Sequence, residues 1–108
     1  MTLQLDWLRG CATALVTPFA ADGEIDEKRL RELIEYQITG GVRVLVPCGT
    51  TGESVTMTEE ENSFVIRTTV ELSRGRARVI AGTGSNSTAV TIRRSQAARE
   101  RRIVTAVE

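Results

Sequence analysis

Residues 42–54, VRVLVPCGTTGES, decide the fold class of this chain. Apolar residues fill positions 42–48 almost without a break, which is typical of a strand covered on both faces of a sheet. The chain then passes directly into a loop of glycines, threonines and a serine at 49–54, where backbone amides and hydroxyls are the main polar groups. A buried strand that ends in such a loop indicates an α/β protein, because ligands in these folds lie at the carboxyl ends of the strands.

The order strand, loop, helix occurs three times along the chain, at intervals of roughly 35 residues. Strands are predicted at 11–19, 42–48 and 77–84, and helices at 26–39, from 58 to about 74, and from about 85 to 102. Parallel neighbours need a helix to bring the chain back, so this alternation predicts a parallel sheet with right-handed crossovers. We see no residue-level repeat that would favour a solenoid instead.

Local signals mark where the helices begin and end. Asp26 is the expected N-cap of the first helix, and Gly40 follows its last apolar residue. Thr58 and Glu61 form a T-x-x-E capping box at the start of the second helix. The Asp22-Gly23 pair predicts a turn before the first helix.

The composition narrows the function classes. The 108 residues suffice for one folding unit or less, and 14 basic and 14 acidic residues cancel, so no overall field favours nucleic acid or an anionic membrane. No apolar run approaches the roughly 18 residues of a membrane span, and the start does not resemble a secretory signal, so we expect a soluble, cytoplasmic protein. Arginines gather at 93–102 without interleaved aromatic residues, which favours a solvated face over a phosphate-binding patch.

The reactive residue types are few. The absence of histidine excludes Ser-His-Asp and Cys-His catalysis, and Lys28 is the single lysine available for covalent amine chemistry. Cys11 and Cys48 have no CxxC spacing, so we expect two buried free thiols rather than a zinc site or a disulfide. We therefore expect no metal and no cofactor.

The loop GTTGES at 49–54 has two interpretations. Gly49 and Gly52 allow close backbone approach, and the hydroxyls of Thr50, Thr51 and Ser54 beside the amides suit a small carboxylate. Alternatively, the loop is an ordinary glycine turn with hydroxyl caps. It lacks the Gly-Lys-Ser/Thr of a nucleotide-binding loop, and we expect its glutamate, residue 53, to fix backbone amides rather than to act as a base.

Four motifs carry a resemblance to a known family: TALVTPF at 13–19, DGEID at 22–26, LVPCGTTGES at 45–54 and GRARVIAGTGSNST at 75–88. Together they resemble the opening of the dihydrodipicolinate synthase (4-hydroxy-tetrahydrodipicolinate synthase) family, within the pyruvate-dependent class I aldolases. The paired threonines favour this branch over the N-acetylneuraminate lyases. The resemblance implies the first three βα units of a TIM (β/α)8 barrel, truncated, with residues 1–108 forming the N-terminal part of that domain.

The resemblance also implies an activity and its residues. Family members condense pyruvate with aspartate semialdehyde in lysine biosynthesis, through a Schiff base on a barrel lysine, and assemble as homo-oligomers. Carried over, Thr50 is a proton relay that also binds the pyruvate carboxylate together with Thr51 and Gly52. Asn86 and Ser54 match positions of the feedback-lysine site in regulated members.

Several positions depart from the family pattern. Val90 stands where regulated members have a glutamate, and Glu59 and Asn62 replace histidines, so lysine inhibition is not expected. The family's tyrosine motif and Schiff-base lysine have no counterpart here, because Tyr36 and Lys28 fall within the first helix. We expect the chain to be inactive and marginally stable alone.

The last part of the chain also departs from the family. Residues from about 93 to 108 lack the glycine turn expected after the third helix, which suggests a divergent or out-of-frame tail. Three further functions stay open. One is a non-catalytic half-barrel that associates with itself or with a separate remainder, since strand edges invite pairing. The second is another member of the pyruvate-dependent aldolase family, and the third is an isolated small-anion binder.

Overall fold

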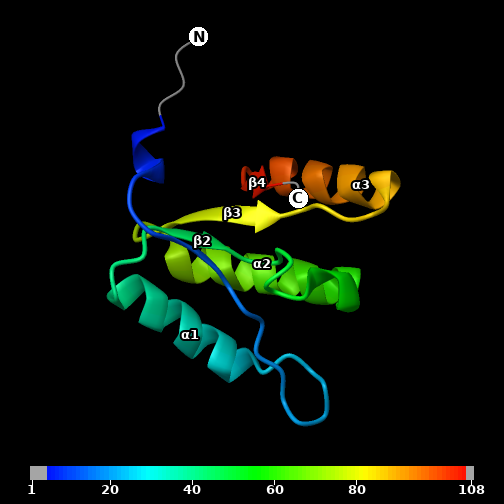
Figure 1. The fold of residues 1–108 in the computed structure, drawn as a ribbon, viewed down its shortest axis with the longest axis horizontal. Coiled ribbons are helices and arrows are strands. Elements are labelled where there is room, and N and C mark those ends of the chain that lie inside the picture. The colour runs from blue at the N-terminus through cyan, green and yellow to red at the C-terminus, as the bar shows by residue number, and fades with distance from the viewer. Residues whose placement is uncertain (1–4, 107–108) are drawn as a thin grey trace.

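The computed structural model describes residues 5–106. Short 3-10 turns accompany the main helices and strands (Figure 1). In chain order the elements are η1 (Asp6–Leu8), β1 (Ala12–Ala14), α1 (Glu27–Thr39), β2 (Val44–Val46), η2 (Ser54–Thr56), α2 (Glu59–Ser73), β3 (Arg78–Gly82), α3 (Thr88–Glu100) and β4 (Val104–Ala106).

The strands form one parallel sheet in the order β1-β2-β3-β4. Thr13 is in register with Leu45, and Leu45 with Val79, so the three predicted strands pair as neighbours. This confirms the α/β class and the parallel sheet with returning helices. The fourth strand was not predicted; its residue Val104 pairs with Ile80 of β3.

The predicted caps fix the helix starts. The Asp26 side chain accepts a hydrogen bond from the Arg29 amide at 3.0 Å, and α1 begins at the next residue. In the capping box, the Glu61 amide donates to the Thr58 hydroxyl at 3.1 Å, while the Thr58 amide donates to the Glu61 carboxylate at 2.9 Å. Because Thr58 directly follows the loop after β2, this cap fixes where that loop joins α2.

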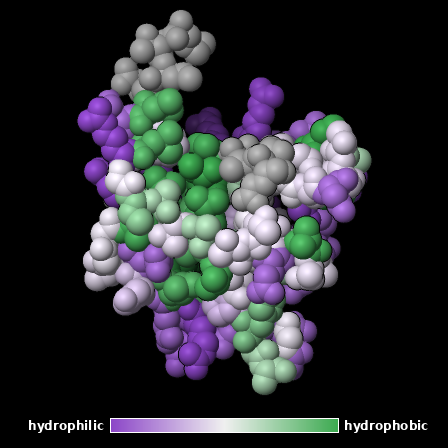
Figure 2. Space-filling model, viewed as in Figure 1, coloured by the Kyte–Doolittle hydropathy of each residue, from purple (hydrophilic) through white to green (hydrophobic). Residues whose placement is uncertain are grey.

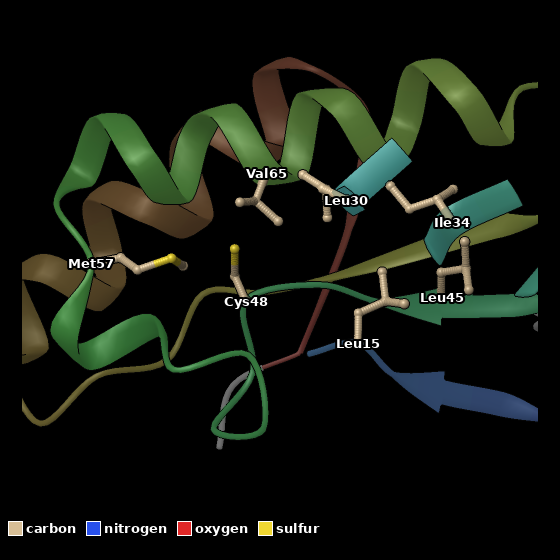
Figure 3. Packing of buried hydrophobic residues seen from close by; sticks show 7 residues of the cluster. All are labelled: Leu15, Leu30, Ile34, Leu45, Cys48, Met57 and Val65. Carbon is tan, nitrogen blue, oxygen red and sulfur yellow. The ribbon is translucent and has the colours of Figure 1, made fainter. Parts of the chain in front are cut away.

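The core lies between the sheet and the two helices α1 and α2 (Figure 3). Leu15, just after β1, and Leu45 of β2 meet apolar side chains of both helices there, and the Cys48 sulfur points toward α2. The buried cluster comprises Leu15, Leu30, Ile34, Leu45, Cys48, Met57 and Val65. Cys48 thus packs as expected, but the same expectation is wrong for Cys11, which is exposed just before β1.

Helix α3 is less apolar than α1 and α2. Its fully buried residue is Ala98, and a cavity of about 280 Å³ lies between it and α2. Most arginines at 93–102 are exposed as predicted, but Arg94 is not, since only 13% of its side chain is accessible. Within the described residues, no helix is long and apolar enough to cross a membrane.

One face of the sheet carries exposed apolar residues. Hydrophobic residues gather on the face seen in Figure 2, beside the segment that leads into β1. Leu8 and Val16 flank β1 and are 42% and 52% exposed, and Val104 of the opposite edge strand is 48% exposed. The sheet therefore has one covered face and two strands, β1 and β4, that each pair on a single side.

The two cysteines provide a test of this fold. At neutral pH a thiol reagent should label Cys11 rapidly and leave Cys48 unmodified, because Cys48 is 2% exposed in the core. Mass spectrometry after labelling should show one modified thiol in native buffer and two in denaturant. Rapid labelling of both thiols in native buffer would show that the core does not form. A Cys11→Ser variant, which should take up no label when native, is the control.

Candidate functional site

A cavity of about 310 Å³ opens where β2 and β3 end. Thr50 and Ser54 line it from the loop after β2, and Ser85 and Asn86 line it from the loop after β3. Both loops lie at the carboxyl ends of the strands, on the right of Figure 1. The cavity therefore has two walls of hydroxyl and amide groups, which suit a small polar ligand.

The floor of the cavity is a close contact between two backbones. A Cβ atom added at Gly82 would lie 2.2 Å from the Cys48 carbonyl oxygen and 2.8 Å from the Gly49 nitrogen. The Gly82 amide also donates to the Pro47 carbonyl at 2.9 Å. Only a glycine allows the end of β3 to approach the first residues of the neighbouring loop this closely.

The loop after β2 has an unusual backbone conformation. Cys48 and Glu53 both have φ of 60°, in the left-handed region that costs a residue with a side chain about 1 kcal/mol. Between them the amides of Gly52 and Glu53 donate to the carbonyls of Gly49 and Thr50, at 3.1 and 3.0 Å. From the segment after β1, the Thr17 hydroxyl donates to the Gly52 carbonyl at 2.7 Å and ties the turn to the core.

Asn62 of α2 fixes the second half of this loop. Its side-chain nitrogen donates to the carbonyls of Ser54, Met57 and Thr58, at 3.1, 3.4 and 3.0 Å. These three acceptors fix the orientation of the amide, because the oxygen could not replace the nitrogen there. The oxygen Oδ1 is buried and has no hydrogen-bond partner. Asn62 therefore fixes the backbone conformation of this part of the loop from its position on α2.

Cys48 lines the cavity but is not poised as a nucleophile. Desolvation by burial raises the pKa of the Cys48 thiol to about 12, and the positive charge of Arg94 offsets only part of this. The sulfur donates to the Asn62 carbonyl at 3.5 Å. At neutral pH the thiol stays protonated, so its role is packing.

The loop after β3 is held mainly by α3. The Ser85 amide donates to the Thr91 hydroxyl at 3.0 Å, and the Ser87 amide donates to the Ser85 hydroxyl at 3.0 Å. Ser87 is also the N-cap of α3. These bonds fold the loop back on the first turns of its own helix.

Arg94 connects this second loop to α2. Its guanidinium donates to both carboxylate oxygens of Glu59, with a shortest distance of 2.6 Å, and to the Gly84 carbonyl at 3.3 Å. The hydrogen bond from Arg94 lowers the pKa of Glu59, and the same bond raises the pKa of Arg94. Both groups therefore stay charged at neutral pH.

The structure brings three of the predicted site residues together and leaves two outside. Thr50, Ser54 and Asn86 line the cavity, whereas Thr51 is exposed beside it and Gly52 is buried in the turn. The expectation for Glu53 is wrong, because its exposed side chain caps no helix and its backbone supplies the bend.

Three residues shape the site in ways that were not predicted from the sequence: Gly82, Asn62 and Arg94. Gly82 carried a signal, since a glycine at the end of a buried strand marks a close backbone approach. Asn62 and Arg94 carried none that a single sequence reveals, because their partners lie in loops whose path depends on the fold.

Comparison with known proteins identifies the family. The model of the dihydrodipicolinate synthetase family matches residues 7–107, nearly the whole chain. The chain belongs to this family. A 4-hydroxy-tetrahydrodipicolinate synthase of Sorangium cellulosum is 61% identical over 92 residues, which are 84% of this chain and 31% of that relative.

Solved structures of the family share the fold. Dihydrodipicolinate synthase of Aquifex aeolicus superposes with a TM-score of 0.84 at 41% identity, covering 91% of this chain and 33% of that one. N-acetylneuraminate lyase of Proteus mirabilis superposes with a TM-score of 0.82 at 33% identity, covering 89% and 33%. The chain thus spans about a third of the length of the family members it matches, and corresponds to the N-terminal portion of their TIM barrel.

Gly82 offers a direct test of the contact between the walls. Gly82→Ala should lower the free energy of unfolding by about 2 kcal/mol, because the added methyl overlaps the Cys48 carbonyl and the backbones must separate. Urea denaturation measures the loss, and the amide shifts of Thr50 and Thr51 should move with it. Gly40→Ala is the matched control, since Gly40 has a helical φ of −74° and should change stability by no more than about 1 kcal/mol. If the two substitutions lowered the free energy of unfolding equally, the conclusion that residue 82 must be a glycine would be wrong.

Proposed function

We propose that this chain is the N-terminal part of a 4-hydroxy-tetrahydrodipicolinate synthase and that its cavity binds the carboxylate of pyruvate. The observation that carries the proposal is the meeting of Thr50, Ser54 and Asn86 in one cavity of a family member. In the sequence-based expectation these residues belong to the substrate loop and to the neighbouring regulatory site. The finding that all three line one cavity supports the expectation that the two sites are neighbours.

The backbone supports Thr51 as a carboxylate ligand. Among the described residues, the Thr51 amide donates to no backbone carbonyl, whereas the next two amides are used within the turn. An exposed amide beside a threonine hydroxyl is a suitable donor pair for a carboxylate. Gly52 would contribute through the turn that it forms, because its own amide already donates to Gly49. Thr50 would pass protons once an adjacent base or phenol is present.

No lysine of this chain lines the cavity, so the amine that a Schiff base requires is missing there. Its single lysine, Lys28, lies in the first turn of α1, where its side chain is 86% exposed and pairs with Glu32 at 3.9 Å. Lys28 does not line the cavity. We therefore propose that the 108-residue chain binds pyruvate but does not catalyse its condensation with aspartate semialdehyde.

A pyruvate titration tests the binding step. In NMR spectra, pyruvate should shift the amide signals of Thr50, Thr51 and Asn86 in a saturable way, and Thr51→Val should weaken the effect by removing the hydroxyl while keeping the shape. Thr39→Val, at the exposed end of α1, is the control. The proposal would be refuted if these amide signals did not shift even at the highest pyruvate concentration that dissolves. Turnover of pyruvate with aspartate semialdehyde would refute the proposed inactivity.

A second candidate function is association through the open sheet, and the exposed apolar residues favour it. Strands β1 and β4 each have an unpaired edge, and Val16 and Val104 beside them are about half exposed. We expect light scattering after size-exclusion chromatography to show a defined dimer that Val16→Lys reduces to a monomer. A wild-type monomer, or an aggregate without defined size, would contradict this function. Val55→Lys, in η2, where the side chain is already 73% exposed, is the control.

A further inference from the structure

Arg94 connects three segments of the chain: α3, which carries it, the start of α2 and the loop after β3. The residue lies on α3, its guanidinium makes three hydrogen bonds to the Glu59 carboxylate at 2.6 to 3.1 Å, and a fourth reaches the Gly84 carbonyl at 3.3 Å. Only 13% of its side chain is exposed, so the guanidinium is largely withdrawn from solvent. A planar fork of donors can serve two acceptors in fixed directions, which a lysine ammonium does not do.

One of the two acceptors lines the cavity and the other lies beyond its first wall. Glu59 does not line the cavity; it is the first residue of α2, the helix that the chain enters after the wall that carries Thr50 and Ser54. Gly84 lines the cavity itself and immediately precedes Ser85 and Asn86. One guanidinium therefore joins the start of α2, which follows the first wall, to Gly84 in the second wall.

Two other sets of side-chain hydrogen bonds each hold one wall. The bonds between Ser85 and Thr91 tie the second loop to α3, and those of Asn62 tie the first loop to α2. Each of these sets fixes one wall on its own helix. In the described part of the chain, the side-chain hydrogen bonds between α2 and α3 are those of Arg94 with Glu59.

We propose that Arg94 is a positioning residue, which fixes the spacing of the two cavity walls and preorganises them for a small carboxylate. Its contact with Gly84 holds the second loop, and its pair with Glu59 anchors the guanidinium to the start of α2, the helix that follows the first wall. A ligand that bridges Thr50 and Asn86 then meets walls already at the right distance, and less ordering free energy is lost on binding. The role in binding rests on the proposed carboxylate site, whereas the effect on the loop does not.

Hydrogen exchange in the absence of ligand tests the positioning directly. In Arg94→Leu, the amides of Ser85 and Ser87 should exchange about tenfold faster, because a charged hydrogen bond to the loop is lost. Amides in the middle of α2 should keep their rates. Arg99→Leu is the control, since Arg99 is exposed on the same helix. Equal acceleration of the loop and of α2 would overturn the proposal, because it would show a general loss of stability.

A charge-reversed pair of residues distinguishes the contact of one guanidinium with two acceptors from a simple ion pair between residues 59 and 94. Glu59→Arg combined with Arg94→Glu restores opposite charges but removes the donor to the Gly84 carbonyl, so the loop amides should stay fast. Arg94→Lys should likewise restore little protection. If either variant returned the exchange rates to those of the wild type, the proposed role of the guanidinium fork would be refuted. Arg94→Lys also keeps the test valid if Arg94→Leu does not fold.

Pyruvate binding gives the functional arm of the test. If the wild type binds pyruvate, Arg94→Leu should weaken binding about tenfold, while Arg99→Leu leaves it unchanged. Unaltered affinity in Arg94→Leu would overturn the proposed preorganisation. If the wild type binds no pyruvate, the proposed function fails, and the exchange rates alone decide whether Arg94 positions the loop.

Discussion

The contact between the end of β3 and the first residues after β2 is the constraint on which the site depends. Gly82 has no room for a side chain, because the Cys48 carbonyl and the Gly49 nitrogen occupy that space. The contact holds the two strand ends together and forces the chain after Cys48 to turn away at once, with a positive φ. The loop with Thr50 and Thr51 therefore leaves the sheet in a direction set by backbone packing. The local strain at Cys48 is offset by the burial of its side chain in the core.

The helices then fix each loop through side chains rather than through the sheet. Asn62 holds the first loop by three carbonyls, and Ser87 with Thr91 holds the second at the start of α3. Arg94 joins the two arrangements through Glu59. The pair is exposed on the side of Glu59, so it adds little to global stability, and its effect is on geometry. The pair requires an ionised Glu59, whose pKa is lowered, so it persists well into mildly acidic solution and is lost only as the pH falls through that lowered value.

Much of this architecture could be predicted because its signals are local. The helix of 26–39, its Asp26 cap and the Thr58–Glu61 capping box each depend on neighbours in sequence, and all were found at the expected residues. The strand β4 was missed because its short apolar segment lacks a glycine turn before it and is defined by pairing with β3. Arg94 was expected in a solvated face because charge runs usually are solvated, and only the packing of α3 beside α2 reveals its partner. Cys11 was expected inside on residue type alone, but the strand that it precedes lies at the sheet edge.

The same distinction between local and distant interactions separates two parts of the site, the cavity and the amine for a Schiff base. Both walls of the cavity, the glycine between them and the helices that support them come from consecutive βα units of this chain. A Schiff base, in contrast, needs an amine that points into the cavity, and the single lysine lies on the outer helix α1. In a parallel sheet such an amine can come only from the carboxyl end of a strand that faces the same cavity, or from the loop after that strand. Under the proposed function, binding of the carboxylate and formation of the covalent bond are separable properties of this fold, and the residues of this chain would account for the first.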